Sequence, residues 1–230
     1  LGAAALQHGG MGTLRLGLGS GPGAMLMTPW LVHMAQHFPG VKVAVTRGPA
    51  ELQVQQLRDR QLDVLVVDVR RVLPAADLLI GPVYDMPAGL LCRAGHPLLR
   101  QHTRGVPFDA LLAYPIASTP LSDEVARMLV AHYGPQADPQ QMTTVQCEEI
   151  ASLLDTVRQT DAVFLGILGA ARRELAQGEM VALKVKPPLQ AGALLGLVTL
   201  AGRSELPVMA EFRQFVARQM APVAEGVAHV

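Results

Sequence analysis

The sequence has few cysteines, few aromatic side chains and no excess of charge of either sign. Its 230 residues include 2 cysteines, and aromatic residues make up 4% of the chain. Two cysteines far apart in sequence, Cys92 and Cys147, do not form a disulfide framework and are typical of a reducing compartment. The formal net charge is zero, so the overall composition gives no general electrostatic reason to bind nucleic acid.

Long apolar runs are also absent. No stretch approaches the roughly 20 apolar residues that a membrane helix needs. The first ten residues, LGAAALQHGG, lack the basic and apolar regions of a secretion signal. We therefore expect a cytoplasmic protein that has no membrane partner. The chain begins with Leu rather than Met, so we expect it to be part of a longer protein.

Half of the residues are hydrophobic, and their spacing alternates between strand and helix periods. Strand-like runs at 13–20, 41–47 and 63–69 are separated by helical periods that start at Pro22 and Gly48. The first of these helices is predicted to bury one face made of Met27, Leu31, Met34 and Phe38. Pro29 is expected in its first turn, where a missing N–H is tolerated. Repeated strand–helix–strand units predict a parallel α/β sheet with right-handed crossovers.

A second alternation follows Pro107. It includes strands near 114–118, 143–148 and 161–167, and a helix whose N-cap is predicted to be Ser122. Two long apolar runs, 87–95 and 192–202, connect the two halves, and a last amphipathic helix follows Leu206. We therefore expect two Rossmann-like α/β subdomains joined by two crossover strands. The expected boundaries are 1–12 for the end of a linker, 13–90 and 192–225 for subdomain I, and 91–191 for subdomain II.

The glycine-rich stretch LGLGSGPGAMLMTP (16–29) lies between a strand and a helix, but three catalytic motifs fail there. A dinucleotide fingerprint that starts at Gly17 requires glycine where Pro22 stands, and a P-loop requires a Lys followed by Ser or Thr. A nucleophile elbow around Ser20 requires glycine at positions 18 and 22. The turn still presents free N–H groups at a helix N-terminus, which suits an anionic or hydroxylated ligand. A purely structural turn is an equally supported interpretation.

The histidines and cysteines give no clear cofactor or metal site. His33 and His37 are four residues apart on a helix, but the glutamate of the HExxH motif is missing. We expect them to be exposed or interface histidines, and we expect Cys92 and Cys147 to be buried, inert thiols.

Two aspartates, Asp63 and Asp68, flank the strand near 63–69. They are compatible with a carboxylate pair for hydrolysis, although turn residues at the ends of a strand are the favoured interpretation. No Ser-His-Asp set is identifiable by spacing, so the residues themselves suggest no catalyst.

Polar residues recur where strands end and helices begin, at 46–50, 117–120 and 146–149. Ligands of open α/β sheets bind outside the carboxyl ends of the strands. We therefore predict a cleft between the lobes, lined by Ser20, Gly48, Ser118 and Thr119, with hydroxyl and amide groups but few charges. Such a pocket without an evident catalyst is typical of a sensor.

Several segments follow one another in a distinctive order along nearly the whole chain. They are GTLRLGLGS, Pro29, HFPGVKVAV, GPAELQVQQLRDRQLDVLVVD, LLCRAGHPLL and VQCEEIASLLDTV. In this order and spacing the chain resembles the effector-binding domain of LysR-type transcriptional regulators. The resemblance implies a fold similar to type 2 periplasmic binding proteins, with a small-molecule effector between the subdomains and no enzymatic activity. It also implies an amino-terminal winged helix-turn-helix that binds promoter DNA and is absent from this chain.

Carried over by position, the resemblance implies effector contacts at seven residues: Ser20, Gly21, Gly48, Pro49, Ser118, Thr119 and Glu148. Many members have Thr or Ser where Pro49 stands, and Pro removes both a hydroxyl and an N–H. The late family motif G-x-G-I-x-x-x-P is replaced by the residues from Thr160 to Val163, with Ile167 in place of the proline. With no arginine assigned to the pocket, a sugar and a small organic acid are equally supported effectors.

Family members commonly pair antiparallel, which implies a homodimer or higher oligomer with residues 26–38 beside residues 125–133 of a second copy. Two other functions remain open. One is a solute-binding protein of a transport system, and the other is a small-metabolite enzyme of the same fold. The enzyme would need a proton-transfer residue, for which Glu148 and Asp68 are the first candidates.

Overall fold

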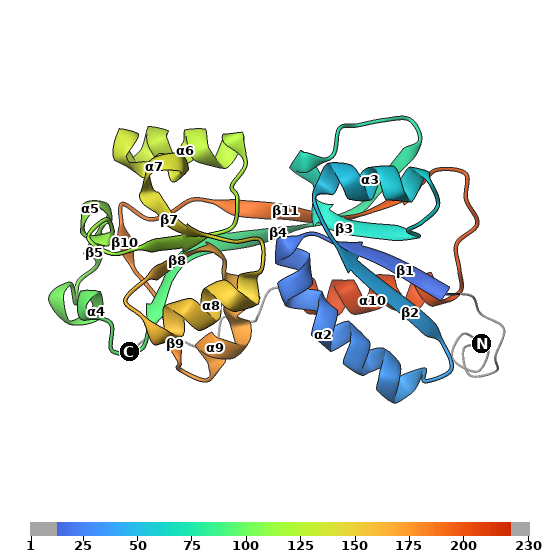
Figure 1. Cartoon of the computed structure of the whole chain (residues 1–230), viewed down its shortest axis with the longest axis horizontal. Helices are drawn as coiled ribbons and strands as arrows, with labels where there is room; N and C mark the ends of the chain where they lie inside the picture. Colours follow the sequence, from blue (N-terminus) through green and yellow to red (C-terminus); the bar gives the residue numbers. More distant parts are fainter. Residues whose placement is uncertain (1–12, 222–230) are drawn as a thin grey trace. The chain divides into compact units, whose positions relative to one another are not determined.

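The computed structural model describes residues 13–221, so the predicted linker at 1–12 and residues 222–225 of predicted subdomain I lie outside the described residues. The chain divides into two compact units (Figure 1). Among the described residues, unit 1 comprises 13–84 and 195–221, and unit 2 comprises Asp85–Leu194. Both unit boundaries fall inside long strands, β4 (Leu78–Arg93) and β11 (Gly192–Leu200). The chain therefore passes between the units in two extended segments.

Unit 1 is built on a mixed sheet in the order β2 (Lys42–Arg47), β1 (Thr13–Leu18), β3 (Val64–Asp68) and β11. The first three strands are parallel, and β11 is antiparallel to β3. Helix α3 (Ala50–Arg58) lies on one face of the sheet, and α2 (Ser20–His37) and α10 (Val208–Met220) lie on the other (Figure 1). Residues 64–67 of β3 are buried, as their continuous run of Val and Leu predicts for a strand covered on both faces.

Helix α2 buries part of the face that the sequence predicts, since Met34 and the following Phe38 are buried and Met27 is partly buried. Its buried large residues include Leu26, Trp30 and Met34, whereas Leu31 is 42% exposed. The ring of Trp30 packs against Phe212 and Phe215 of α10, with centroid distances of 5.0 and 5.1 Å. The prediction is therefore wrong for Leu31, because the large indole ring of Trp30, spaced i+4 from Leu26, occupies the interface with α10.

Pro29 also lies in an unexpected place. Since α2 begins at Ser20, Pro29 is inside the helix rather than in its first turn. A proline there has no N–H to donate to the carbonyl of Met25, one turn earlier. The predicted position of Pro29 in the first turn is therefore wrong, because the helix starts in the glycine-rich turn, two residues before Pro22.

Unit 2 has its own sheet, in the order β4, β8 (Val163–Ile167), β6 (Ile116–Ser118) and β7 (Thr143–Gln146), with β9 (Met180–Ala182) paired to β4. Strands β8, β6 and β7 are parallel, and β4 is antiparallel to β8. The longer helices are α6 (Asp123–Tyr133) and α8 (Ile150–Gln159). The Ser122 hydroxyl accepts a hydrogen bond from the Val125 amide at 3.3 Å, which confirms the predicted N-cap of α6.

Several short elements complete unit 2. They are α4 (Pro97–Gln101), α5 (Phe108–Leu111), α7 (Pro139–Met142), α9 (Arg172–Ala176), and the pair β5 (Val106–Pro107) and β10 (Val185–Lys186). Most of them were not predicted, because two to five residues contain too little periodicity to identify an element. Strand β4 also begins nine residues before the predicted run at 87–95, since Gly81 and Pro82 interrupt its apolar pattern.

Candidate functional site

In unit 1 the predicted effector residues lie at the carboxyl ends of neighbouring strands. Leu18 at the end of β1 is opposite Arg47 at the end of β2. Ser20 and Gly21 therefore follow β1 at the same edge of the sheet where Gly48 and Pro49 follow β2. All four positions are at least partly exposed. Since α2 and α3 start directly after these turns, this edge presents two helix N-termini.

The first turn of α2 has no neutralising side chain of its own. Its N-cap residue is Gly19, no side chain caps it, and the first turn contains no acidic residue. Pro22 has no N–H, and the Gly23 amide bonds to the Gly19 carbonyl at 2.8 Å. The amides of Ser20 and Gly21 precede the first intrahelical hydrogen bond and therefore have no carbonyl partner within the helix. These two N–H groups, together with the helix dipole, favour a negatively charged group at this position.

The structure adds Arg47 to this edge. A Cβ atom built on Gly23 would lie 3.0 Å from Nε and 3.3 Å from Cζ of Arg47. The guanidinium of Arg47 therefore lies against the first turn of α2. The sequence analysis assigned no arginine to the pocket and so did not identify this residue. The signal in the sequence is its position as the last residue of β2, directly before Gly48 and Pro49.

A buried amide supports the loop after β2. Gln53 is fully buried in α3, and its Nε2 donates to the Thr46 carbonyl at 3.3 Å. The Thr46 hydroxyl donates to the Leu16 carbonyl, also at 3.3 Å. The Gln53 Oε1 atom is buried and has no hydrogen-bond partner among the described residues. These contacts hold the main chain just before Arg47 against β1 and α3.

In unit 2 the predicted residues also follow strand ends. Ser118, the last residue of β6, is opposite Gln146 of β7 and Leu165 of β8. Thr119 is partly exposed, and Glu148, two residues after β7, is exposed. Ser118 is fully buried, and its hydroxyl donates to the Leu165 carbonyl at 2.8 Å. The hydroxyl proton of Ser118 is thus used in a hydrogen bond between β6 and β8. The neighbouring Thr119 has the hydroxyl that a ligand can reach. One cleft lined by residues of both lobes stays a prediction.

Asp63 and Asp68 lie at opposite ends of β3, so a carboxylate pair is wrong. One carboxylate oxygen of Asp68 accepts hydrogen bonds from the Arg70 amide at 3.1 Å and from its Nε at 3.0 Å. The other oxygen accepts from Nη2 of Arg70 at 2.7 Å. Asp68 caps the short 3-10 helix η1 (Val69–Arg71). It is therefore a turn residue at the end of a strand, as expected.

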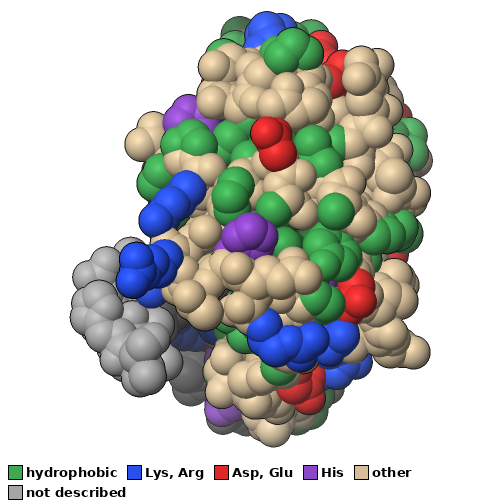
Figure 2. Space-filling view, turned by 90° about the vertical axis from the view of Figure 1, so that its left-hand side faces the viewer, with side chains coloured by type: hydrophobic (Ala, Val, Ile, Leu, Met, Phe, Trp, Pro, Cys, Tyr) green, Lys and Arg blue, Asp and Glu red, His purple; other side chains and the backbone are tan. Residues whose placement is uncertain are grey.

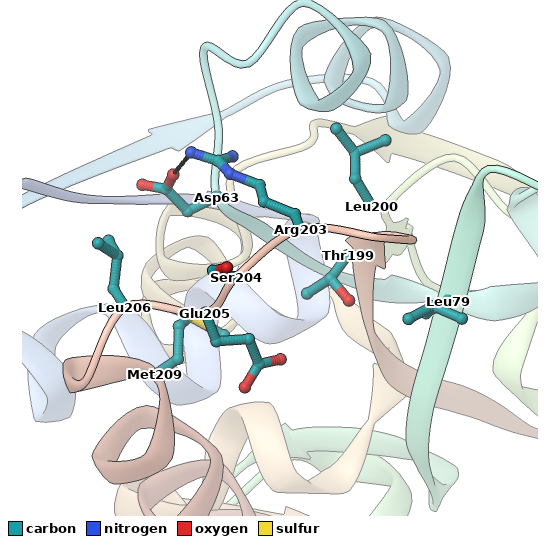
Figure 3. Close-up of a pocket in the computed structure, with 9 residues that line it drawn as sticks. All are labelled: Asp63, Leu79, Thr199, Leu200, Arg203, Ser204, Glu205, Leu206 and Met209. Carbon is teal, nitrogen blue, oxygen red and sulfur yellow. Dashed lines mark ion pairs between the residues drawn. The ribbon is translucent and has the colours of Figure 1, made fainter.

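Asp63 is held by two arginines beside a small cavity in unit 1. The cavity has a volume of about 50 Å³ and is lined by Asp63, Leu79, Thr199, Leu200, Arg203, Ser204, Glu205, Leu206 and Met209. Figure 3 shows Asp63 and Arg203 directed toward each other, and their ion pair is 2.9 Å long. Arg15 binds the same carboxylate at 3.0 Å. Ligand pockets commonly exceed about 300 Å³, so this cavity is too small for an effector.

His33 and His37 lie on the surface side of α2 in unit 1. His33 Nε2 lies 2.8 Å from Oε1 of Glu211, which links α2 to α10, and His37 is exposed. This confirms the expectation of exposed or interface histidines. Within residues 13–221, no group of three or more His, Cys, Asp or Glu residues is placed to hold a metal ion.

The two cysteines differ in solvent exposure. Cys92 is buried, and burial raises the pKa of its thiol to about 12. Cys147 is partly exposed, and its Sγ accepts a hydrogen bond from the Glu149 amide at 3.2 Å. The prediction of a buried thiol is therefore correct for Cys92 and wrong for Cys147, because the chain has already left β7 and reached the surface.

The part of the chain that the structure describes contains no helix long and apolar enough to cross a bilayer.

At the level of the whole sequence, the family model of the LysR substrate binding domain matches residues 7–221. The chain belongs to the LysR family of regulators. It is a ligand-sensing LysR domain, which favours the regulatory interpretation over a transport protein or an enzyme of the same fold.

Individual LysR relatives agree with this assignment. The SDS degradation transcriptional activation protein of Pseudomonas sp. (strain ATCC 19151) is 32% identical over 212 residues, which cover 92% of this chain and 68% of that protein. The structure of CrgA, a LysR-type regulator from Neisseria meningitidis, matches with a TM-score of 0.72 at 12% identity, over 95% of this chain and 70% of that chain. The regulatory domain of MexT from Pseudomonas aeruginosa matches with a TM-score of 0.68 at 18% identity, over 91% of this chain and 98% of that chain. The two structures show the fold, which is that of type 2 periplasmic binding proteins, as the resemblance implied.

Proposed function

We propose that this LysR domain senses a small organic anion with the residues at the carboxyl ends of its strands. The observation that carries the proposal is the guanidinium of Arg47 against the uncapped first turn of α2. A cation and two unpaired amides offset the cost of removing water from a carboxylate or sulfate, and such charge-assisted hydrogen bonds are stronger than neutral ones. Ser20, Gly21, Gly48 and Pro49 surround this position.

Unit 2 contributes a different chemistry to the proposal. Thr119 offers a hydroxyl, and Glu148 offers a carboxylate that accepts hydrogen bonds from hydroxyl groups. These groups recognise the uncharged polar part of a ligand rather than its anionic group. We therefore infer a small organic acid or sulfate ester that carries further polar groups, with an uncharged sugar as the alternative.

The Pseudomonas relative suggests the first compounds to test. Its name refers to the degradation of SDS, which is an alkyl sulfate. A sulfate head group has the charge and acceptor oxygens that Arg47 and the α2 amides favour. Short alkyl sulfates and alkyl carboxylates are therefore the preferred probes, since they keep the head group and do not denature proteins as SDS does.

For the whole regulator, we infer a cytoplasmic homodimer or higher oligomer that contacts promoter DNA through winged helix-turn-helix modules. An effector that binds two conformations of the domain unequally shifts their populations and so reorients these modules. Leu31 and Val32 on α2, which are 42% and 47% exposed, support a contact between copies of the chain.

The test is calorimetric titration of the 230-residue chain with hexyl sulfate, hexanoate, hexanol and glucose. We expect the two anions to bind, and Arg47→Gln to weaken them by about 10-fold or more, as the loss of a charge-assisted hydrogen bond predicts. Lys42→Gln is the matched control, because Lys42 is an exposed cation at the other end of the same strand. Thr119→Ala tests the strand ends of unit 2.

Each other result has a defined meaning. Binding of glucose but not of the anions would establish the sugar alternative and contradict the role of Arg47. Equal losses in Arg47→Gln and Lys42→Gln would show a general charge effect and contradict the site. Chemical conversion of a bound probe would make the domain an enzyme.

A further inference from the structure

The cations of unit 2 are unevenly distributed. Two segments, 94–107 and 180–194, contain Arg100, Arg104, Lys184 and Lys186 but no Asp or Glu. The rest of unit 2 carries eleven acidic and five basic side chains. The whole chain has three lysines. Two of them are here: Lys186 is the last residue of strand β10, and Lys184 directly precedes that strand. The charge of unit 2 is therefore separated, although the chain as a whole is neutral.

The fold brings these two segments together. Strand β10 pairs with β5 in parallel, with Val185 opposite Val106, and the Val106 amide donates to the Lys184 carbonyl at 2.8 Å. Both valines are buried, whereas Lys184 and Lys186 are exposed. The two lysines thus lie on the outer face of this small sheet. We call Arg100, Arg104, Lys184 and Lys186 the basic surface.

Gly105 allows the close approach of one lysine. It has a φ of +119°, and a Cβ atom there would lie 2.5 Å from Cε of Lys186. The stem of Lys186 therefore crosses over Gly105, next to Arg104. Two residues along a strand are about 6.6 Å apart, so Lys184 and Lys186 are far enough apart to contact separate anionic groups.

The basic surface is not neutralised by the described residues. Among residues 13–221, none of its four cations forms an ion pair with a carboxylate, and Arg100 reaches only the Gly95 carbonyl, at 3.4 Å. Asp161 and Glu179, at the ends of neighbouring strands, are paired with Arg93 and Arg158. In Figure 2, which views the side of unit 2 that carries α4, β5 and β10, basic side chains follow one another down the left-hand side, and the visible acidic side chains lie elsewhere.

The basic surface also lies away from the effector residues. Strand β4 ends at Arg93, and it is antiparallel to β8, with Leu91 opposite Phe164 near the amino end of β8. The chain continues from Arg93 into α4 and β5, whereas Ser118 and Glu148 follow the carboxyl ends of β6 and β7. A ligand of the basic surface is therefore distinct from the effector.

We propose that the basic surface binds the phosphate backbone of double-stranded DNA. DNA is a dense row of negative charges, and lysine and arginine side chains bind it by releasing condensed cations. The chain belongs to a family of transcriptional regulators, so DNA is the polyanion near which it works. This inference rests on the proposed function in one respect, namely that the domain works near DNA as part of a regulator. The contact adds sequence-independent affinity and leaves base recognition to other parts of the regulator.

The test measures fluorescence anisotropy of a labelled 25-base-pair duplex of arbitrary sequence with the 230-residue chain. Four neutralised phosphates predict a slope of about −3.6 for log K against log salt, which is a loss of about 150-fold between 50 and 200 mM salt. The variant with Lys184→Gln and Lys186→Gln should reduce the slope to about −1.8 and the loss to about 12-fold. Lys42→Gln with Arg127→Gln is the matched control, since both are exposed cations outside the basic surface.

Three results would overturn the proposal. They are no binding at 25 mM salt, an equal change of slope in the control variant, and equally tight binding of polyglutamate, which would indicate an acidic protein partner instead. Thermal melting of each variant checks that it is folded. Titration with effector probes involves no DNA, so failure of the effector site and failure of the DNA contact are distinguishable.

Discussion

Arg47 and Gly23 are in contact, although 24 positions separate them in the sequence. The Nε atom of Arg47 lies 3.0 Å from the position that a Cβ on Gly23 would take. The glycine thus makes room for the guanidinium over the first turn of α2. A glycine-rich turn and an arginine at the end of a strand thus lie side by side, and this contact supports the anion-binding position that we propose.

This contact predicts the effect of a single methyl group. Gly23→Ala should displace the Arg47 side chain, because 3.0 Å is closer than most Cβ contacts allow. Gly23 lies inside a helix, where alanine is the better helix former by about 1 kcal/mol, so the melting temperature should change little. The affinity for hexyl sulfate should fall several-fold, as measured by calorimetry. Gly40→Ala is the control, because nothing lies within 4 Å of a Cβ there.

Asp63 should stabilise unit 1 only when it is ionised. Burial raises the pKa of its carboxyl, but hydrogen bonds from the Arg15 side chain and amide and the charges of Arg15 and Arg203 outweigh this effect, and the pKa falls below its ordinary value of 3.8. Asp63→Asn should lower the free energy of unfolding by about 1 to 2 kcal/mol at pH 7, since both arginines remain partly hydrated.

The pH dependence of this variant follows from the sign of the shift. Because the folded-state pKa is below the unfolded-state pKa, ionised Asp63 contributes its full stability above the unfolded-state value. That contribution is lost as the pH falls through the folded-state pKa. The difference between the urea unfolding curves of the wild type and of Asp63→Asn should therefore shrink as the pH falls below 3.8. A difference that is as large at pH 3 as at pH 7 would mean that the carboxylate charge is not the cause.

The two cysteines should react at very different rates. Cys147 is partly exposed, whereas Cys92 is buried with a pKa of about 12, so almost none of Cys92 is thiolate at pH 8. A thiol reagent such as Ellman's reagent should modify one cysteine in the native chain and two after denaturation in guanidinium chloride. Cys147→Ser should abolish the native reaction, and Cys92→Ala should not. Fast reaction of Cys147→Ser would contradict the burial of Cys92.

The proposed pairing of copies predicts a change in oligomeric state. Leu31 lies on the exposed side of α2 and is 42% exposed. A charge at an apolar contact between chains must be buried without a partner, so Leu31→Glu should convert dimers to monomers. Light scattering after size-exclusion chromatography measures the mass. Leu73→Glu is the control, since Leu73 is 86% exposed on a loop. Dissociation caused by Leu73→Glu but not by Leu31→Glu would place the contact elsewhere.

Local patterns predicted much of the fold. Residues 150, 153, 154 and 157 of α8 are buried, and so are residues 209, 212, 216 and 220 of α10; their helical spacing makes them one face of an amphipathic helix. Strand β3 and the Ser122 cap were predicted for similarly local reasons. The buried face of α2 was predicted only in part, through Met34 and Phe38. The aromatic rings of α10, more than 180 positions away, pack on Trp30, which local spacing did not indicate.

The residues of the candidate site also fall into two groups, those that local patterns predicted and those that only the tertiary structure brought together. The sequence by itself determined the family, the order of strands and helices, and the loops at strand ends where Ser20, Gly48 and Thr119 lie, because these depend on periodicity and turn chemistry along the chain. Only the tertiary structure decided that Arg47 lies on α2, that the Ser118 hydroxyl is used by Leu165, and that Lys184 and Lys186 adjoin Arg104. Those relationships join residues distant in sequence, and they depend on strand register and side-chain packing, which no local pattern contains.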